Sequence, residues 1–211
     1  MPRLRSTPCN GGFIFAENPA RAAPEAQIIW HADLDPGALR VTAVRADPCV
    51  PDAVDPARLA PWLAVAIDRD GHEHAVLTDG WLHIRLDVAA GSLVEGCPVI
   101  LHYDLHGVQS ARKGLLPLSR LLHLCRHGRF AASLFPADAR VPRGLVLLRV
   151  HDALVQEASQ RDIAVTLFGD AQVDLDWSYR SDALRSRMRR LVADARAMAR
   201  GGYRALMRDA R

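Results

Sequence analysis

The hydrophobic pattern changes its period part-way along the chain, and this change limits the folds that the chain can adopt. Over residues 62–106, apolar and polar side chains alternate with the two-residue period of half-buried strands. Asp70-Gly71 and Asp79-Gly80 separate these runs, and Asp-Gly between alternating runs is typical of hairpins because glycine accepts positive φ. This region therefore predicts a small antiparallel sheet.

From residue 114 onward, apolar residues recur at the three- and four-residue intervals of amphipathic helices. We expect a first helix over residues 115–125 and a second over residues 145–158, which is apolar nearly all round and should be the buried central helix. A short third helix should begin after Ser159, because Asp162 follows at capping-box spacing, and it should end at Gly169.

These patterns predict an α+β protein, with a β-rich N-terminal portion built from antiparallel hairpins and a helical C-terminal domain. The expected parts are a loop-rich segment at 1–27, a small antiparallel β domain at 28–110 and a helix-turn-helix-like domain at 114–211. Four scattered cysteines predict neither a disulfide framework nor a zinc site. No apolar run approaches the roughly 20 residues of a membrane span, and the start does not resemble a signal peptide. We therefore expect a cytoplasmic protein that does not enter a membrane.

Basic residues are concentrated at the C-terminal end of the chain. Residues 180–211 contain ten arginines and three aspartates, a net charge of +7. Because the whole chain carries +3, residues 1–179 carry about −4. A basic end on an acidic body indicates that this end meets a polyanion such as nucleic acid.

A last long helix near residues 182–200 places this charge on one side. At about 100° per residue, Leu184, Met188 and Leu191 fall with other apolar residues in one arc, and the arginines flank it. The helix follows a short capped helix, as in a helix-turn-helix, although residues 169–179 form a longer turn than the usual three or four residues. The residues predicted to contact DNA bases or phosphates are Arg180, Ser181, Arg185, Ser186 and Arg189, with Arg187, Arg190 and Arg196 supporting along the backbone.

The C-terminal part also resembles a known family. Residues 161–169, 185–192 and the ending Met-Ala-Arg-Gly-Gly-Tyr-Arg-Ala-Leu-Met at 198–207 are similar to the proteobacterial family called domain of unknown function 2285. That family includes the C-terminal domain of FseA-type activators and the QseM-type antiactivators of integrative and conjugative element transfer. The resemblance implies a helix-turn-helix variant that acts in transcription or element excision. The N-terminal tryptophan segment of longer members is absent here, which suggests the downstream partner of a split gene.

Two alternatives to a DNA-binding regulator stay open. In the first, the chain is a protein-interaction module that binds a related activator or the transcription machinery, with the surface of the helix at residues 145–158 as its contact. In the second, it is a metal-dependent enzyme built on strand histidines, because His74, His83 and His102 can share one face of a sheet. No motif for nucleophilic catalysis, phosphate cradling or a cofactor accompanies them, so we expect neither enzymatic activity nor a cofactor. The remaining candidate ligands near them are His72, Glu73 and His106.

Overall fold

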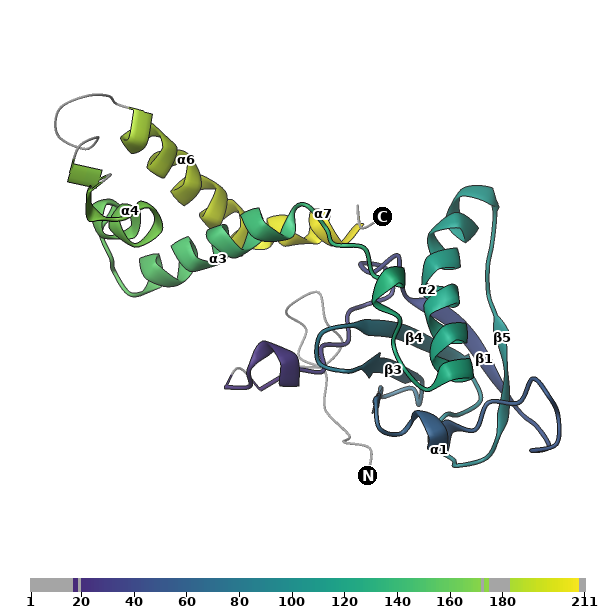
Figure 1. Cartoon of the computed structure of the whole chain (residues 1–211). Coiled ribbons are helices and arrows are strands. Elements are labelled where there is room, and N and C mark those ends of the chain that lie inside the picture. The colour runs from purple at the N-terminus through teal and green to yellow at the C-terminus, as the bar shows by residue number, and fades with distance from the viewer. Residues whose placement is uncertain (1–16, 19, 172, 175–182, 209–211) are drawn as a thin grey trace. The chain divides into compact units, whose positions relative to one another are not determined.

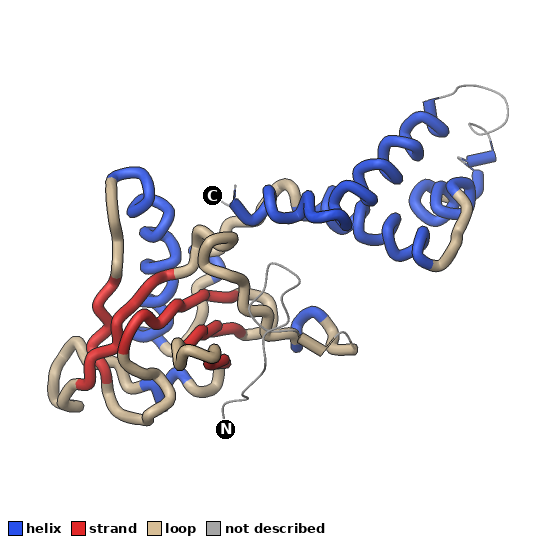
Figure 2. The backbone as a smooth tube through the Cα atoms, turned by 180° about the vertical axis from the view of Figure 1, so that it is seen from behind, coloured by secondary structure: helices blue, strands red, loops and turns tan. Residues whose placement is uncertain are grey.

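The computed structural model describes residues 17–18, 20–171, 173–174 and 183–208, and it contains two compact units. The first, here called the sheet unit, comprises Met1–Pro136 together with Met207–Arg211; the second, the helical unit, covers Ala137–Leu206. The chain is α+β, as predicted, with a mostly antiparallel sheet followed by helices (Figures 1 and 2).

Five strands form the sheet in the order β2-β3-β4-β1-β5. Neighbouring strands are antiparallel except β1 and β4, which run parallel. The two predicted turns are present, since Gly71 and Gly80 both have positive φ, of 85° and 98°. The strands are β1 (Leu39–Arg45), β2 (Leu63–Ile67), β3 (Glu73–Thr78), β4 (His83–Ala90) and β5 (Val99–Tyr103).

One face of the sheet is covered by α2 (Val108–His127) (Figure 1). Leu77 and Leu86 from the strands and Leu121 from the helix are completely buried in the core between them. The sequence grouped residues 114–136 with the C-terminal helices, whereas the structure places α2 on the sheet. The physical reason is that the apolar face of a sheet has to be covered, and α2 is the first helix with an apolar face after the last strand in the sequence. Short helical turns complete this unit: η1 (Ala23–Glu25), α1 (Pro56–Leu59) and η2 (Ala132–Leu134).

The opposite face of the sheet holds a smaller cluster and a buried charge. Ile29 packs on Ala66 and Val76 there. Arg85 is only 3% exposed, and it donates hydrogen bonds to the carbonyls of Trp30 and Ala75 while pairing with a carboxylate of its own strand. Burial lowers the pKa of this guanidinium. The buried arginine thus fixes residues 29–30 against the sheet.

The helical unit is built on the predicted short capped helix and its two longer neighbours. Ser159 and Asp162 form the expected capping box, in which each side chain bonds the backbone N–H of the other, and Gly169 ends the helix with φ of 86°. Gly201, with φ of 112°, allows the bend after the last long helix. The elements are α3 (Val141–Val155), α4 (Gln160–Phe168), α6 (Ala183–Ala197), η3 (Met198–Gly202) and α7 (Tyr203–Arg208).

The prediction that α3 is a fully buried central helix is wrong. Leu147 and Val150 are buried against α4 and α6, but Leu145 and Leu148 are 53% and 56% exposed. The helix is apolar on two adjoining faces, and its neighbours cover only one of them.

Among the described residues, no helix combines the length and the apolar character that crossing a bilayer would require.

Candidate nucleic-acid interface

Helix α6 has the amphipathic structure that the sequence predicts. Its apolar residues pack against α3 and α4, and the side chain of Met188 in the middle of the stripe is completely buried. The buried residues recur at three- and four-residue intervals and are Leu184, Met188, Leu191, Val192 and Ala195. The arginines are therefore directed away from the core of the helical unit.

The arginines of α6 occupy two flanks of this stripe. Arg185, Arg189 and Arg196 are exposed on one flank, and Arg187 and Arg190 are exposed on the other. All five belong to the set predicted to contact DNA, and the structure divides that set into two groups. Among the described residues, Arg187, Arg190 and Arg196 make no ion pair with a carboxylate, so their charge is available to an external anion.

Three further predicted contacts lie elsewhere. Ser186 is half-buried on α6. Arg180 and Ser181, predicted to contact bases or phosphates at the start of the helix, lie outside the described residues. The participation of all these side chains in DNA binding stays a prediction.

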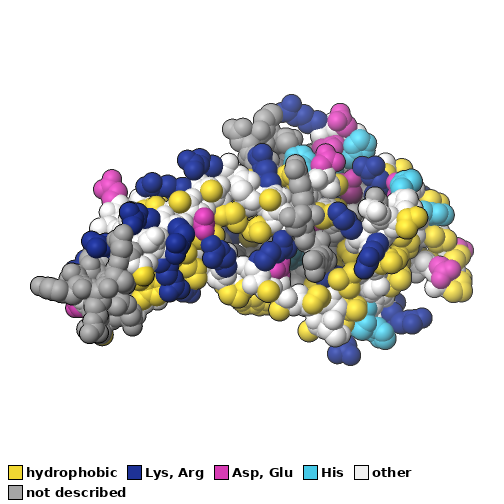
Figure 3. All heavy atoms as spheres, turned by 90° about the horizontal axis from the view of Figure 1, so that it is seen from above, with side chains coloured by type: hydrophobic (Ala, Val, Ile, Leu, Met, Phe, Trp, Pro, Cys, Tyr) yellow, Lys and Arg dark blue, Asp and Glu magenta, His cyan; other side chains and the backbone are white. Residues whose placement is uncertain are grey.

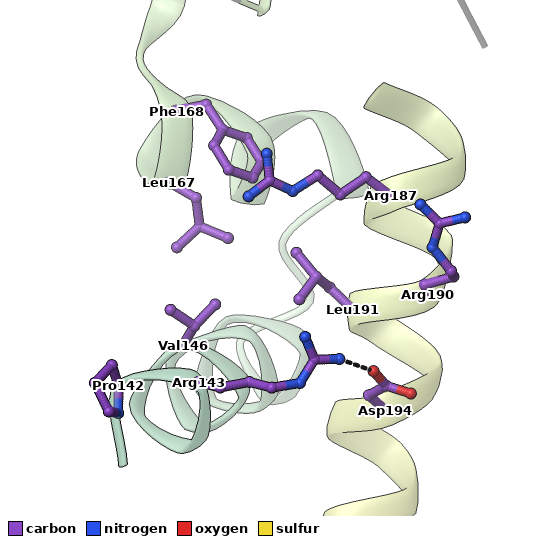
Figure 4. A pocket seen from close by; sticks show the side chains of 9 residues that line it. All are labelled: Pro142, Arg143, Val146, Leu167, Phe168, Arg187, Arg190, Leu191 and Asp194. Atoms are coloured by element: carbon purple, nitrogen blue, oxygen red, sulfur yellow. Dashed lines mark hydrogen bonds and ion pairs between the residues drawn. The ribbon is translucent and has the colours of Figure 1, made fainter. Parts of the chain in front are cut away.

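The flank that bears Arg187 and Arg190 borders a groove of about 590 Å³ between α3, α4 and α6 (Figure 4). Apolar side chains of Val146, Leu167 and Leu191 point into the groove. This flank therefore combines an apolar groove floor with cationic edges, whereas Arg185, Arg189 and Arg196 on the first flank do not line the groove.

Two contacts hold the edges of this groove in place. The guanidinium carbon of Arg187 lies 4.5 Å from the centre of the Phe168 ring, a cation–π arrangement that connects α6 with the end of α4. At the other end, Arg143 of α3 donates to Asp194 of α6 over 2.6 Å (Figure 4). Asp194 is the single carboxylate of α6, and its charge is already used by Arg143. Helix α6 thus presents a net positive charge to solvent.

Basic side chains gather along the helical unit on the face shown in Figure 3. Several arginines of this unit are internally paired, including Arg140 with Asp138 and Arg161 with Asp174, both over 2.7 Å. The pair with Arg140 lowers the pKa of the Asp138 carboxyl to about 2. The unit therefore combines the paired arginines Arg140, Arg143 and Arg161 with a cationic surface on α6.

The connection between α4 and α6 is longer than in a compact helix-turn-helix. Residues 169–182 separate the two helices, and within them residues 170–171 and 173–174 are helical. Val173 is buried in the core of the unit. Residues 175–182, which directly precede α6, lie outside the described residues.

The strand histidines share a face of the sheet, as predicted, but they are not brought together. His74 on β3 is paired in register with Asp87, His83 on β4 with Thr78, and His102 on β5 with Thr42. His74 lies between two carboxylates, with Nδ1 2.7 Å from Asp87 and Nε2 3.2 Å from Asp68.

The hydrogen bond with His74 is the main cause that lowers the pKa of Asp87. Glu73 is buried and accepts hydrogen bonds from the hydroxyl of Ser92 and the backbone N–H of Leu93, while His72 and His106 are exposed. In the described part of the chain, no group of three or more His, Cys, Asp or Glu side chains has the arrangement to hold a metal ion.

Residues 108–208, just under half of the chain, match the model of a family described as "T6SS, Transcription factor, DNA binding domain". This segment is similar to a DNA-binding domain. The matched region contains α6 and the whole helical unit, and it begins at the first residue of α2 in the sheet unit. No curated protein matches the chain. The match supports a DNA-binding family for the C-terminal half. It does not support the specific assignment to the family called domain of unknown function 2285.

Two features of the surface were missed from the sequence. The groove depends on Val146 and Leu167, which look like ordinary core positions until the packing of three helices is known. The second feature is α2, whose cations were counted with the acidic body of the chain. A count over residues 108–136 alone would have found it, because this segment has five Arg or Lys and no Asp or Glu.

Proposed function

We propose that this protein is a DNA-binding transcriptional regulator and that α6 is its principal DNA-contacting element. The observation that carries the proposal is the division of α6 into a stripe packed on α3 and α4 and an exposed surface with five arginines. The match of residues 108–208 to a DNA-binding domain of transcription factors supports the same conclusion independently.

The chemistry of binding follows from the arginines. Guanidinium groups neutralise DNA phosphates and release the counterions condensed on them, which supplies affinity without sequence preference. Arginine can also donate two hydrogen bonds to the O6 and N7 atoms of guanine in the major groove. In this proposal Arg185 and Arg189, with Arg180, Ser181 and Ser186, contact bases or phosphates, and Arg187, Arg190 and Arg196 hold the helix along the backbone.

The proposal extends to the cellular role. The resemblance to FseA-type and QseM-type proteins favours control of the excision or transfer of a mobile genetic element, through a helix-turn-helix variant formed by α4 and α6. The match to a T6SS transcription factor domain supports a role in transcription. We propose that the protein acts in the cytoplasm, on double-stranded DNA, without enzymatic activity and without a cofactor.

Selection of genomic fragments tests this function. The immobilised full chain is incubated with sheared DNA of its own genome at 50 mM salt, and retained fragments are sequenced. We expect enrichment of a few promoter-proximal fragments, and loss of that enrichment in Arg185→Glu/Arg189→Glu. Retention no greater than that of protein-free beads at 50 mM salt would refute the proposal.

A second candidate function rests on α3. The exposed leucines of this helix, Leu145 and Leu148, lie with Val141 and Val155 at the spacing of one helix face, and all four are at least half exposed. Such a face is typical of contacts with another protein. If the chain acts by binding a related activator, Leu145→Ser/Leu148→Ser will abolish co-purification with that activator, while DNA affinity is negligible at every salt concentration.

A further inference from the structure

The sheet unit contains a second concentration of basic residues. Residues 108–136 have five cationic side chains and no carboxylate, whereas residues 1–107 have eight arginines and fourteen carboxylates. The basic segment is α2 with the turn that follows it. It therefore differs in charge from the sheet on which it packs.

Among the described residues, one cation of this segment makes contacts within the protein. Arg120 is half-buried, donates to the carbonyl of Leu134 over 2.8 Å and lies over the ring of Phe135. The remaining four are exposed, and within the described part of the chain none of them forms an ion pair: Arg112, Lys113, Arg126 and Arg129.

Elsewhere in this unit, arginines commonly have carboxylate partners. Arg21 pairs with Glu17, Arg40 and Arg85 pair with Asp87, and Arg45 pairs with Glu95. Of the six arginines in the described residues 20–107, four thus have a carboxylate partner, whereas none of the four exposed cations of residues 108–136 has one in the described part of the chain.

Two of these cations lie on the same side of α2. Arg112 and Arg126 are fourteen residues apart, which returns the helix to within about 40° of the same direction and separates them by about 21 Å. Leu121 and Leu124, on the opposite side, are completely buried against the sheet. The packing of α2 therefore keeps this cationic side in solvent, as the packing of α6 does for its own arginines.

We propose that the exposed side of α2 is a second DNA-contacting surface, in which Arg112 and Arg126 neutralise phosphates of duplex DNA. The proposal rests on the proposed function, because it requires that the protein binds DNA. The region similar to a DNA-binding domain begins at Val108, the first residue of α2, so that similarity includes this helix although it folds with the sheet.

A fluorescence anisotropy titration of the full chain tests this surface. The probe is a fluorescein-labelled 30-base-pair duplex taken from a fragment that the protein retains, measured between 50 and 200 mM salt. The slope of log affinity against log salt is negative, and each lost phosphate contact reduces its magnitude by about 0.9. For Arg112→Ala/Arg126→Ala we expect a slope whose magnitude is smaller by about 1.8 and an affinity at 0.1 M salt that is lower by roughly 60-fold.

The matched control is Arg45→Ala/Arg69→Ala. These two arginines are exposed in the same unit and outside α2, so the control removes the same net charge. We expect its affinity within about threefold of the wild type, because distant charges are screened beyond about 10 Å at 0.1 M salt. Circular dichroism and a thermal melt check that both variants keep the fold.

The outcomes separate this proposal from the proposed function. If Arg112→Ala/Arg126→Ala binds the duplex with wild-type affinity, the proposed DNA contact of α2 is overturned and that of α6 is not affected. The same result is expected if this face of α2 binds another protein instead of DNA. Equal losses in the α2 variant and in the control also overturn it, since they show an effect of net charge alone. Absence of wild-type binding to any duplex overturns both proposals.

Discussion

Replacing Arg185 and Arg189 together by alanine removes two exposed cations from the flank of α6 that does not border the groove. The two residues are one helical turn apart and lie outside the buried stripe of the helix. Alanine is also the best helix former, so the helix itself should not weaken. The variant therefore tests the charge of this flank with little effect on packing.

The expected loss of affinity follows from the number of phosphates. If each arginine neutralises one phosphate, the magnitude of the negative slope of log affinity against log salt decreases by about 0.9 for each substitution, or about 1.8 for both. Extrapolated from 1 M to 0.1 M salt, this is roughly a 60-fold loss of affinity. The free energy of unfolding should change by no more than about 0.5 kcal/mol for each exposed substitution.

The assay is anisotropy with a labelled duplex, accompanied by urea unfolding followed by circular dichroism. An unchanged salt slope and affinity in a folded Arg185→Ala/Arg189→Ala variant would refute the assignment of this flank to DNA. A large drop in the urea midpoint would also contradict the reasoning, because it would mean that these arginines hold the helical unit together.

The remaining predictions concern the framework of the helical unit. Ser159→Ala removes the side-chain cap of α4 and should lower the free energy of unfolding by about 1 kcal/mol in urea, and an unchanged midpoint would show that the cap is not needed. Met188→Ala opens a cavity beneath α6 and should cost about 2–5 kcal/mol; a loss below 1 kcal/mol would mean that α6 is loosely packed. Because the pKa of Asp138 is lowered to about 2, its ion pair stabilises the fold above the ordinary carboxyl pKa near 4 and is lost as pH falls towards 2. An NMR titration should find this midpoint, and Arg140→Gln should raise it; a midpoint near 4 in the wild type would contradict the contact.

Local chemistry in the sequence was sufficient to predict several elements. The capping box at Ser159, the hairpin turns at Asp70-Gly71 and Asp79-Gly80, and the buried stripe around Met188 are all confirmed. Each depends on residues a few positions apart. The candidate site depends on the buried stripe of α6, so the side of this helix that carries the exposed arginines was predictable as well.

Long-range packing was not predictable in the same way. Helix α3 has two apolar faces, and only the positions of α4 and α6 decide that Val150 is buried and Leu148 is exposed. The parallel pairing of β1 with β4 joins Leu39 to Leu86, and alternation within a strand carries no information about its partner. Helix α2 follows the sheet in sequence and resembles its helical successors in composition, yet it packs on the sheet.

The central claim is that packing of one side of α6 leaves a cationic surface that binds duplex DNA. The most direct measurement is the affinity of the wild-type full chain for a labelled duplex at a series of salt concentrations from 50 to 200 mM. With six or more phosphates neutralised, we predict an affinity that falls by roughly 10³-fold or more across this range. Affinity that does not change with salt, or no binding at 50 mM salt, would contradict the claim.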